Sequence, residues 1–129
     1  MRTWIAGMAM IAAAGLAAPG AAQRATLARH AEHYALASCL TEQAEPYLKE
    51  QGYGLGAIVD NRAGGAADRF AGVRTAVAAE LKRRPMAVIR GDGPVGAEKR
   101  MPIAHCVDVV DAPGVRAAIG RAAASRRGR

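Results

Sequence analysis

We predict that the rest of the chain is organised around the stretch MPIAHCVDVVD, residues 101–111. It contains one of only two cysteines in the chain. Its apolar side chains recur at helical spacing, at Ile103, Cys106, Val107 and Val110. This spacing places the four residues on one face of a helix, and Pro102 suits its first turn because the missing backbone N–H is not needed there. We therefore expect a helix that directs Cys106 into a core.

The other cysteine, Cys39, lies in a second helical pattern that runs from Arg24 to Gln43. Helical spacing also relates Leu36, Cys39, Leu40 and Gln43, so Cys39 should face inward as well. The two cysteines are 67 residues apart. A bond across a loop of that length stabilises a domain by about 4 kcal/mol in the chain-entropy account. The alternative is two separate buried thiols.

Residues 1–22 have the three-part layout of a secretory signal. Arg2 gives a positive start, an apolar run of 15 residues extends from Trp4 to Ala18, and small residues lead to a cleavage point after Ala22. A membrane-spanning helix needs about 20 apolar residues, so we favour a cleaved signal over a membrane anchor. An exported chain enters an oxidising compartment, where a disulfide persists.

Residues 23–129 then form a single small domain with a basic C-terminal tail. The full chain carries 18 basic and 11 acidic side chains, and loss of Arg2 leaves 17 against 11, a net charge of +6. Much of the excess comes from the end of the chain, at Arg116, Arg121, Arg126, Arg127 and Arg129. A basic tail can bind nucleic acid or an anionic surface. Without interleaved aromatic residues to stack on bases, we expect a solvated, fraying end and no nucleic-acid partner.

The middle of the chain adds two helical segments. Pro46 begins a short helix over residues 45–51, after which three glycines loosen the chain up to a connection at residues 61–65. A clear apolar face follows, at Ala66, Phe70, Val73, Val77 and Leu81. Pro85 should end this helix, in which Glu80 can pair with Arg84 one turn later.

Two more segments complete the expected fold. Residues 86–90 are an extended segment or the entry to a glycine loop. Pro113-Gly114 breaks the helix of residues 101–111, and a final apolar face follows at Val115, Ala118, Ile119 and Ala122. The sequence thus predicts an all-α fold, a small four- or five-helix bundle clamped by one disulfide, with little strand.

Motifs that suggest a bound cofactor or metal are weak. Residues 91–96, GDGPVG, match a dinucleotide fingerprint with Asp111 about 20 residues on, but Pro94 removes a donor and no β-α-β unit surrounds it. His30 and His33 are one turn apart, yet a zinc site needs three or four ligands. We expect a mobile loop, two surface histidines, no cofactor and no metal.

Candidate catalytic groups fail for similar reasons. His105 and Cys106 are neighbours along a helix and do not face each other, and an oxidised cysteine is not a nucleophile. Asp108 and Asp111 lie one turn apart, but acid–base catalysis requires a pocket around them. We therefore expect no catalytic residues and do not expect an enzyme.

The two cysteine segments, together with the signal and the length, resemble the type VI secretion amidase immunity family (Tai-type periplasmic immunity proteins). The residues that carry the resemblance are YALASCL at 34–40, Ile103, CVD at 106–108, and the final apolar helix near Val115. The chain departs from the pattern at Val110, where an aromatic residue is common, and in its glycine-rich middle.

The resemblance implies a small, exported helical protein of the periplasm in which the two cysteines form a disulfide. It also implies a partner, a secreted peptidoglycan amidase whose cysteine–histidine cleft the immunity protein covers, often as a homodimer. The expected dissociation constant is near nanomolar, about −12 kcal/mol, across an interface of about 1,600 Å².

We expect the toxin-contacting residues between residues 90 and 100, a loop rich in charge and glycine between two helices. The candidates are Arg90, Asp92, Lys99 and Arg100. Two rival hypotheses remain. One is an exported helical adaptor or envelope-binding protein without a toxin partner. The other is a basic nucleic-acid-binding module, which requires a cytoplasmic location and a steep salt dependence of affinity.

Overall fold

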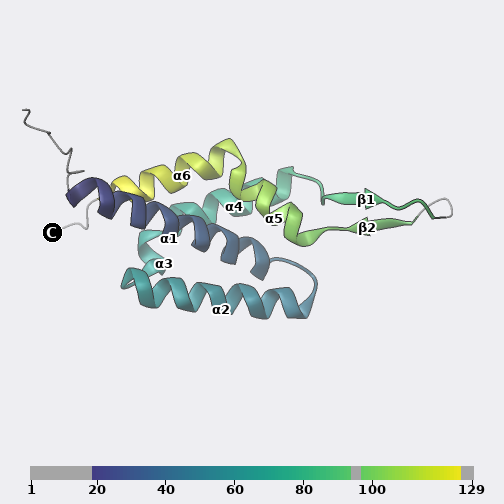
Figure 1. Ribbon diagram of the computed structural model, residues 1–129, viewed down its shortest axis with the longest axis horizontal. Helices are drawn as coiled ribbons and strands as arrows, with labels where there is room; N and C mark the ends of the chain where they lie inside the picture. Colours follow the sequence, from purple (N-terminus) through teal and green to yellow (C-terminus); the bar gives the residue numbers. More distant parts are fainter. Residues whose placement is uncertain (1–18, 94–96, 126–129) are drawn as a thin grey trace, which may run out of the picture.

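The computed structural model of the chain describes residues 19–93 and 97–125. Over these residues the chain forms six helices and two short strands. In chain order they are α1 (Pro19–Thr41), α2 (Pro46–Ala63), α3 (Ala66–Arg69), α4 (Ala71–Arg83), β1 (Val88–Arg90), β2 (Glu98–Arg100), α5 (Pro102–Asp111) and α6 (Pro113–Ala124). The predicted all-α fold is confirmed, and the strands form a two-stranded ribbon that extends from one end of the bundle (Figure 1).

Helix α1 is the centre of the bundle. It contacts α2, α4, α5 and α6, while α4 also packs against α6. Figure 1 shows α2 along one side of α1 and the pair α4 and α6 along the other. A helix with partners on several sides must bury more than one stripe, and α1 does so with alanines. Its buried residues are Ala31, Tyr34, Ala35, Ala37, Cys39 and Leu40.

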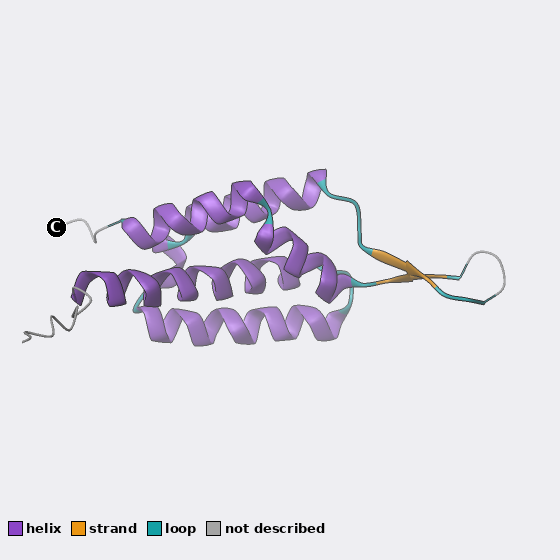
Figure 2. Ribbon diagram, turned by 45° about the horizontal axis from the view of Figure 1, so that its top comes forward, coloured by secondary structure: helices purple, strands orange, loops and turns teal. Residues whose placement is uncertain are grey.

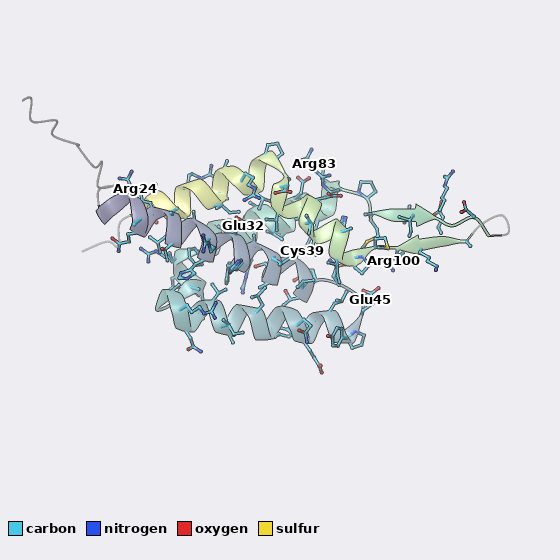
Figure 3. All side chains as sticks on the ribbon, viewed as in Figure 1. Arg24, Glu32, Cys39, Glu45, Arg83 and Arg100 are labelled. Atoms are coloured by element: carbon cyan, nitrogen blue, oxygen red, sulfur yellow. A yellow bond between two sulfur atoms is a disulfide. The ribbon has the colours of Figure 1, made fainter. Side chains whose placement is uncertain are left out.

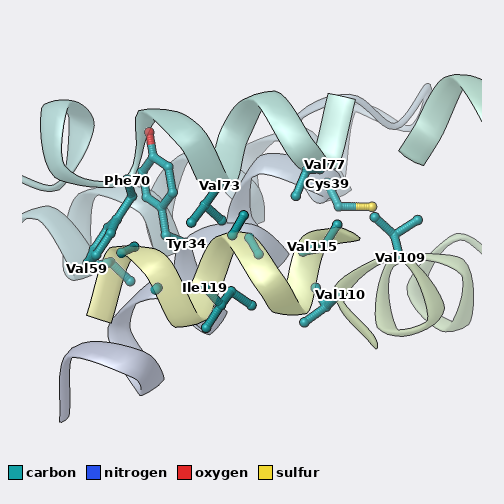
Figure 4. Close-up of a cluster of buried hydrophobic side chains, with 14 of the residues drawn as sticks. Tyr34, Cys39, Val59, Phe70, Val73, Val77, Val109, Val110, Val115 and Ile119 are labelled. Atoms are coloured by element: carbon teal, nitrogen blue, oxygen red, sulfur yellow. The ribbon is translucent and has the colours of Figure 1, made fainter. Parts of the chain in front are cut away.

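The core joins these helices through small aliphatic residues and one aromatic pair. Phe70 is fully buried, and its ring centroid lies 5.5 Å from that of Tyr34. Figure 4 shows this pair at one end of the core and Cys39 at the other, with Val73 and Val77 of α4 between them. The tilted ring arrangement is one that aromatic pairs prefer. The predicted inward face of residues 66–77 is therefore confirmed, with Leu81 half-buried beside it.

Helix α2 is longer than the sequence predicted. We expected a short helix to Gln51 and a loose glycine segment, whereas one helix runs from Pro46 to Ala63. Gly52 explains the difference, because a Cβ built there would lie 2.7 Å from the backbone nitrogen of Thr41. The glycine lets α2 approach α1 closely, and the burial of Leu48, Val59 and Ala63 on the same face offsets its low helix propensity.

The helix predicted over residues 66–84 is divided in two. Phe70 has φ −106° and ψ 17°, which is not helical, and separates α3 from α4. The short α3 follows Gly64 and Gly65, both at positive φ, a conformation that glycine adopts without steric cost. Asp60 supports this corner by accepting a 2.6 Å hydrogen bond from the backbone N–H of Ala66. The corner turns the chain so that Phe70 enters the core.

The predicted disulfide between Cys39 and Cys106 is present, with the two Cα atoms 5.6 Å apart. It joins the last turn of α1 to α5 (Figure 3). Gln43 is buried beside it and donates a 3.0 Å hydrogen bond from Nε2 to the backbone oxygen of Cys39. The same nitrogen lies 3.4 Å from Sγ of Cys106. One amide therefore satisfies a carbonyl at the end of α1 and contacts the bond that clamps α1 to α5.

The inward face of α5 differs from the prediction. Cys106 and Val110 are buried as expected, but Ile103 and Val107 are exposed, and His105 and Val109 are buried instead. The apolar residues of this helix form one broad face that extends from Val109 to Val107, and the pattern alone does not show which part of it is buried. The disulfide and the contacts with α1 and α4 select the face that is buried.

Helix α6 includes part of the sequence that we expected to fray. Val115, Ala118, Ile119 and Ala122 are buried as predicted, and the helix continues to Ala124. Arg116 is not a tail residue. Its guanidinium donates to Asp111 and, at 3.1 Å, to Glu32 of α1. These two carboxylates raise the pKa of Arg116, with the hydrogen bond to Asp111 the larger cause.

Several predictions concern residues outside the part of the chain that is described. The signal sequence falls mainly on residues 1–18, and residues 19–22 are the first turn of α1. The tail arginines 126, 127 and 129 and residues 94–96 of the glycine-rich segment are also outside the described ranges. Cleavage after Ala22 therefore stays a prediction.

Candidate partner-binding surface

The segment that we predicted as a loop between two helices contains two paired strands, and we define the hairpin arm as residues 87–93 and 97–101. Strands β1 and β2 pair antiparallel, with Val88 opposite Arg100, Ile89 opposite Lys99 and Arg90 opposite Glu98. All six strand residues are exposed. Figure 2 shows the arm extending away from the helices, so that neither face of the ribbon packs on the bundle.

The register divides the arm into two different faces. Side chains alternate between the faces of a strand, and directly opposed residues share a face. One face therefore has Val88 and Arg90 with their partners, and the other has Ile89 and Lys99. Arg90 and Glu98 form an ion pair of 3.4 Å whose side chains are 86% and 51% exposed. At that exposure the pair is screened by solvent and contributes little to stability.

All four predicted contact residues lie on this arm. Arg90, Lys99 and Arg100 are strand residues, and Asp92 lies beyond the end of β1. The structure places the four on one projecting segment and exposes each of them. Whether they contact a toxin stays a prediction.

The same surface also has an apolar part, which was not predicted from the sequence. Exposed apolar side chains are present on the ribbon, at its base and on the adjoining helix α5. They are Val88, Ile89, Met101, Ile103 and Val107, with Ile103 60% and Val107 50% exposed. Because Ile103 and Val107 are four residues apart, they lie on the same side of α5. We call these five residues together with the hairpin arm the arm surface.

The base of the arm is held at two points. The backbone N–H of Met101 donates a 2.8 Å hydrogen bond to the oxygen of Ala87, which closes the ribbon where it leaves the bundle. Cys106 follows within the first turns of α5 and is covalently bound to α1. The arm therefore projects from a fixed base, although its strands make no extensive contact with a helix of the described residues.

One further ion-pair cluster lies at the end of α4, just before the arm. Glu80 is buried, with its carboxylate between Arg83 and Arg84. The pairing of Glu80 with Arg84 was predicted, and the Arg84 Nε lies 2.9 Å from the carboxylate. The hydrogen bond from Arg83, and a second from Arg84, hold the pKa of Glu80 below its usual value, although burial acts the other way.

The residues considered for catalysis or metal binding are not brought together. His105 is buried and Cys106 is oxidised, while Asp111 pairs with Arg116. Within residues 19–93 and 97–125 there is no group of three His, Cys, Asp or Glu side chains that could hold a metal ion. In the same ranges no helix is long and apolar enough to cross a membrane.

A groove of about 440 Å³ also lies between α1, α2 and α4. Two of the three charged side chains that line it already have partners within the fold. Asp60 accepts the hydrogen bond from Ala66, and the Arg74 guanidinium lies 5.8 Å from the centre of the Tyr34 ring. A cation in that position is attracted by the face of the ring. Because Asp60 and Arg74 already have partners within the fold, the groove is a weaker candidate site than the arm surface.

Comparison of the chain with protein-family models, with curated proteins and with solved structures finds no match. The functional assignment consequently rests on the residues and the geometry described above.

Proposed function

We propose that this protein is a periplasmic immunity protein that binds a type VI secreted peptidoglycan amidase and covers its active-site cleft. The observation that carries the proposal is the hairpin arm with its exposed apolar and charged side chains, held at a base that the disulfide fixes. The resemblance at residues 34–40 and 106–108 indicates the partner class. The disulfide is compatible with an oxidising compartment such as the periplasm.

The shape of the arm suits occlusion of a cleft. Paired strands lie about 4.8 Å apart, so the ribbon is only two strands wide and can lie across a cleft or pair along one edge with a segment beside it. The outer edges of β1 and β2 have no strand partner in the described structure, and such edges can pair with a strand of another protein.

The mixed composition of the arm surface suits a protein partner. Apolar residues such as Ile103 and Val107 can form the desolvated centre of an interface, while Arg90, Lys99 and Arg100 lie beside them as a charged rim. A two-stranded ribbon alone is at best marginally stable in water. Partner contacts on both of its faces would stabilise it on binding.

The direct test is rescue and binding with a panel of small cysteine peptidoglycan amidases, beginning with any that is encoded beside this gene. Co-expression in the periplasm should prevent lysis by one of them, and calorimetry should give a dissociation constant near nanomolar. Absence of both rescue and binding across the panel would contradict the proposal and favour the adaptor hypothesis. Sedimentation of the protein alone would test the proposed homodimer.

The interface residues are tested by replacing Arg90, Asp92, Lys99 and Arg100 together with alanine. Each is exposed, so the fold should be retained while the affinity falls. A matched control replaces four exposed charged residues with the same net charge, Arg29, Arg62, Asp68 and Arg121, whose segments lie at the opposite end of the bundle from the arm. Equal affinity of the arm variant and the control variant would remove these four residues from the interface.

A further inference from the structure

The end of the molecule opposite the arm contains an open, basic hollow of about 720 Å³. Its walls come from the first half of α1, the end of α2, α3 and the end of α6. Figure 1 shows these segments gathered at the same end of the bundle, and Figure 3 labels Arg24 there and Arg100 at the other end. We call this feature the basic hollow.

The charged side chains that line the basic hollow are all basic. They are Arg24, Arg62 and Arg69, and the side chains of Gln23 and His30 also line the hollow. No described aspartate or glutamate lines it. An uncompensated group of three like charges raises the free energy of the isolated protein, and an anion relieves that repulsion.

The three arginines differ from the other arginines that have assigned partners. Arg83, Arg84, Arg90 and Arg116 form ion pairs, and Arg74 lies over a tyrosine ring. Arg24, Arg62 and Arg69 form no ion pair with any carboxylate of the described residues. Nδ1 of His30 is also shielded from solvent without a hydrogen-bond partner in that part of the chain. The three guanidinium groups are thus donors that no carboxylate of the described residues engages.

Helix ends do not cancel this charge. The carboxyl ends of α2 and α6 reach the hollow and each contributes about half a negative charge, while the amino end of α1 is positive. The predicted cleavage after Ala22 would remove Gly20 and place the positively charged amino terminus at Gln23, which also lines the hollow. The positive charge of the three guanidinium groups is larger than the net charge that the helix ends contribute to the hollow. Guanidinium groups bind phosphate through two parallel N–H donors, and the volume is in the range of small-molecule sites, about 300–1,000 Å³.

We propose that the basic hollow binds a phosphate-bearing ligand through Arg24, Arg62 and Arg69. The same chemistry is offered by the headgroup of an anionic phospholipid and by a soluble phosphate ester. The site is at the far end of the molecule from the arm surface, so it does not depend on the proposed immunity function.

The experiment uses the protein purified from the producing cell. Inorganic pyrophosphate is titrated by calorimetry, and vesicles of phosphatidylglycerol are compared with vesicles of phosphatidylcholine by co-sedimentation. Arg62→Gln with Arg69→Gln should weaken binding of the probe at least about tenfold, the loss expected from removing charge-assisted hydrogen bonds. Binding to the lipid vesicles alone would assign the headgroup as the ligand, and binding of pyrophosphate in solution would assign a soluble phosphate.

The matched control is Arg90→Gln with Arg100→Gln, which removes the same charge from the arm. It should retain binding of pyrophosphate or vesicles, while the Arg62/Arg69 variant should retain its thermal unfolding midpoint and its affinity for an amidase. Absence of binding by both probes would overturn the proposal. Equal weakening in both variants would also overturn it, because it would indicate a response to net charge. Tighter binding of citrate than of pyrophosphate would overturn the assignment to phosphate.

Discussion

The clamped part of the bundle and the hairpin arm are adjacent in the chain but have opposite properties. Around the disulfide, Cys39, Gln43, Cys106 and Val109 are buried and bonded. Along the arm, every strand residue is exposed. This difference indicates that the packed bundle supplies nearly all of the free energy of folding. The exposed arm contributes almost none of it, so its residues can adapt to a binding partner at little cost in stability. Substitutions in the two regions should therefore separate stability from affinity.

The largest expected effect is on the clamped region. Replacing Cys39 and Cys106 together with serine should lower the free energy of unfolding by about 4 kcal/mol, because the 67-residue loop is no longer closed in the unfolded chain. Urea unfolding followed by circular dichroism measures this loss. Treatment of the unaltered protein with a reductant is the control and should reproduce it. A loss below about 1 kcal/mol would show that the packing alone, rather than the clamp, supplies the stability of this region.

A smaller loss is expected where α2 crosses α1. Gly52→Ala should lower the free energy of unfolding by about 1–3 kcal/mol, because the new Cβ would lie 2.7 Å from the Thr41 nitrogen and force the helices apart. Gly54→Ala is a matched control on the same helix, since nothing lies within 4 Å of its Cβ position. It should stabilise the protein by about 0.5–1 kcal/mol through helix propensity. Equal thermal shifts for the two variants would contradict the close approach.

The Glu80 cluster, between the bundle and the arm, should give a pH-dependent effect. Its pKa is lower in the folded protein than the usual 4.5, so its contribution to stability is complete above that pH and is lost as the pH falls through the folded-state value. Glu80→Gln should therefore unfold at lower urea than the unaltered protein at about pH 7, and the difference should disappear at about pH 2. A difference that persists in acid would show that packing, rather than charge, stabilises this position.

The smallest effect on stability is expected at the arm surface. Ile103→Ser with Val107→Ser should change the free energy of unfolding by no more than about 0.5 kcal/mol per site, because both side chains are half-exposed or more. The same variant should weaken amidase binding by at least about tenfold if these residues form the apolar centre of the interface. Val109→Ser, on the buried side of the same helix, is the control and should lose about 2 kcal/mol of stability. Full affinity in the Ile103/Val107 variant would restrict the interface to the ribbon.

The sequence predicted those helices whose apolar pattern and end signals lie within the segment itself. The apolar residues around Cys39, Val77 and Ile119 each recur at helical spacing. Pro85 follows the carboxyl end of α4, and Pro102 begins α5. The course of α2 was not predictable in this way, because Gly52 resembles a loop residue until its neighbour Thr41 is known. The helical conformation of that segment depends on a tertiary contact, the close approach of Gly52 to Thr41.

The candidate site was predicted in part. The charge and glycine content of residues 90–100 indicated an exposed segment, and the structure exposes Arg90, Lys99 and Arg100. The hairpin itself was missed, because β2 consists of the charged residues Glu98–Arg100 and lacks the apolar alternation that predicts a strand. The exposed position of Ile103 and Val107 had no local signal, since one broad apolar face of α5 includes these residues as well as Val109, and the disulfide selects the part of it that is buried.

The disulfide also makes the stability of this fold depend on where the chain is. Before oxidation the same sequence lacks the link between α1 and α5, and a difference of about 4 kcal/mol is close to a thousandfold change in the ratio of unfolded to folded molecules. A copy retained in a reducing compartment therefore opens far more often and is more accessible to proteases and to a translocation channel. Under the proposed export, oxidation after transfer would raise the ratio of folded to unfolded molecules by the same factor.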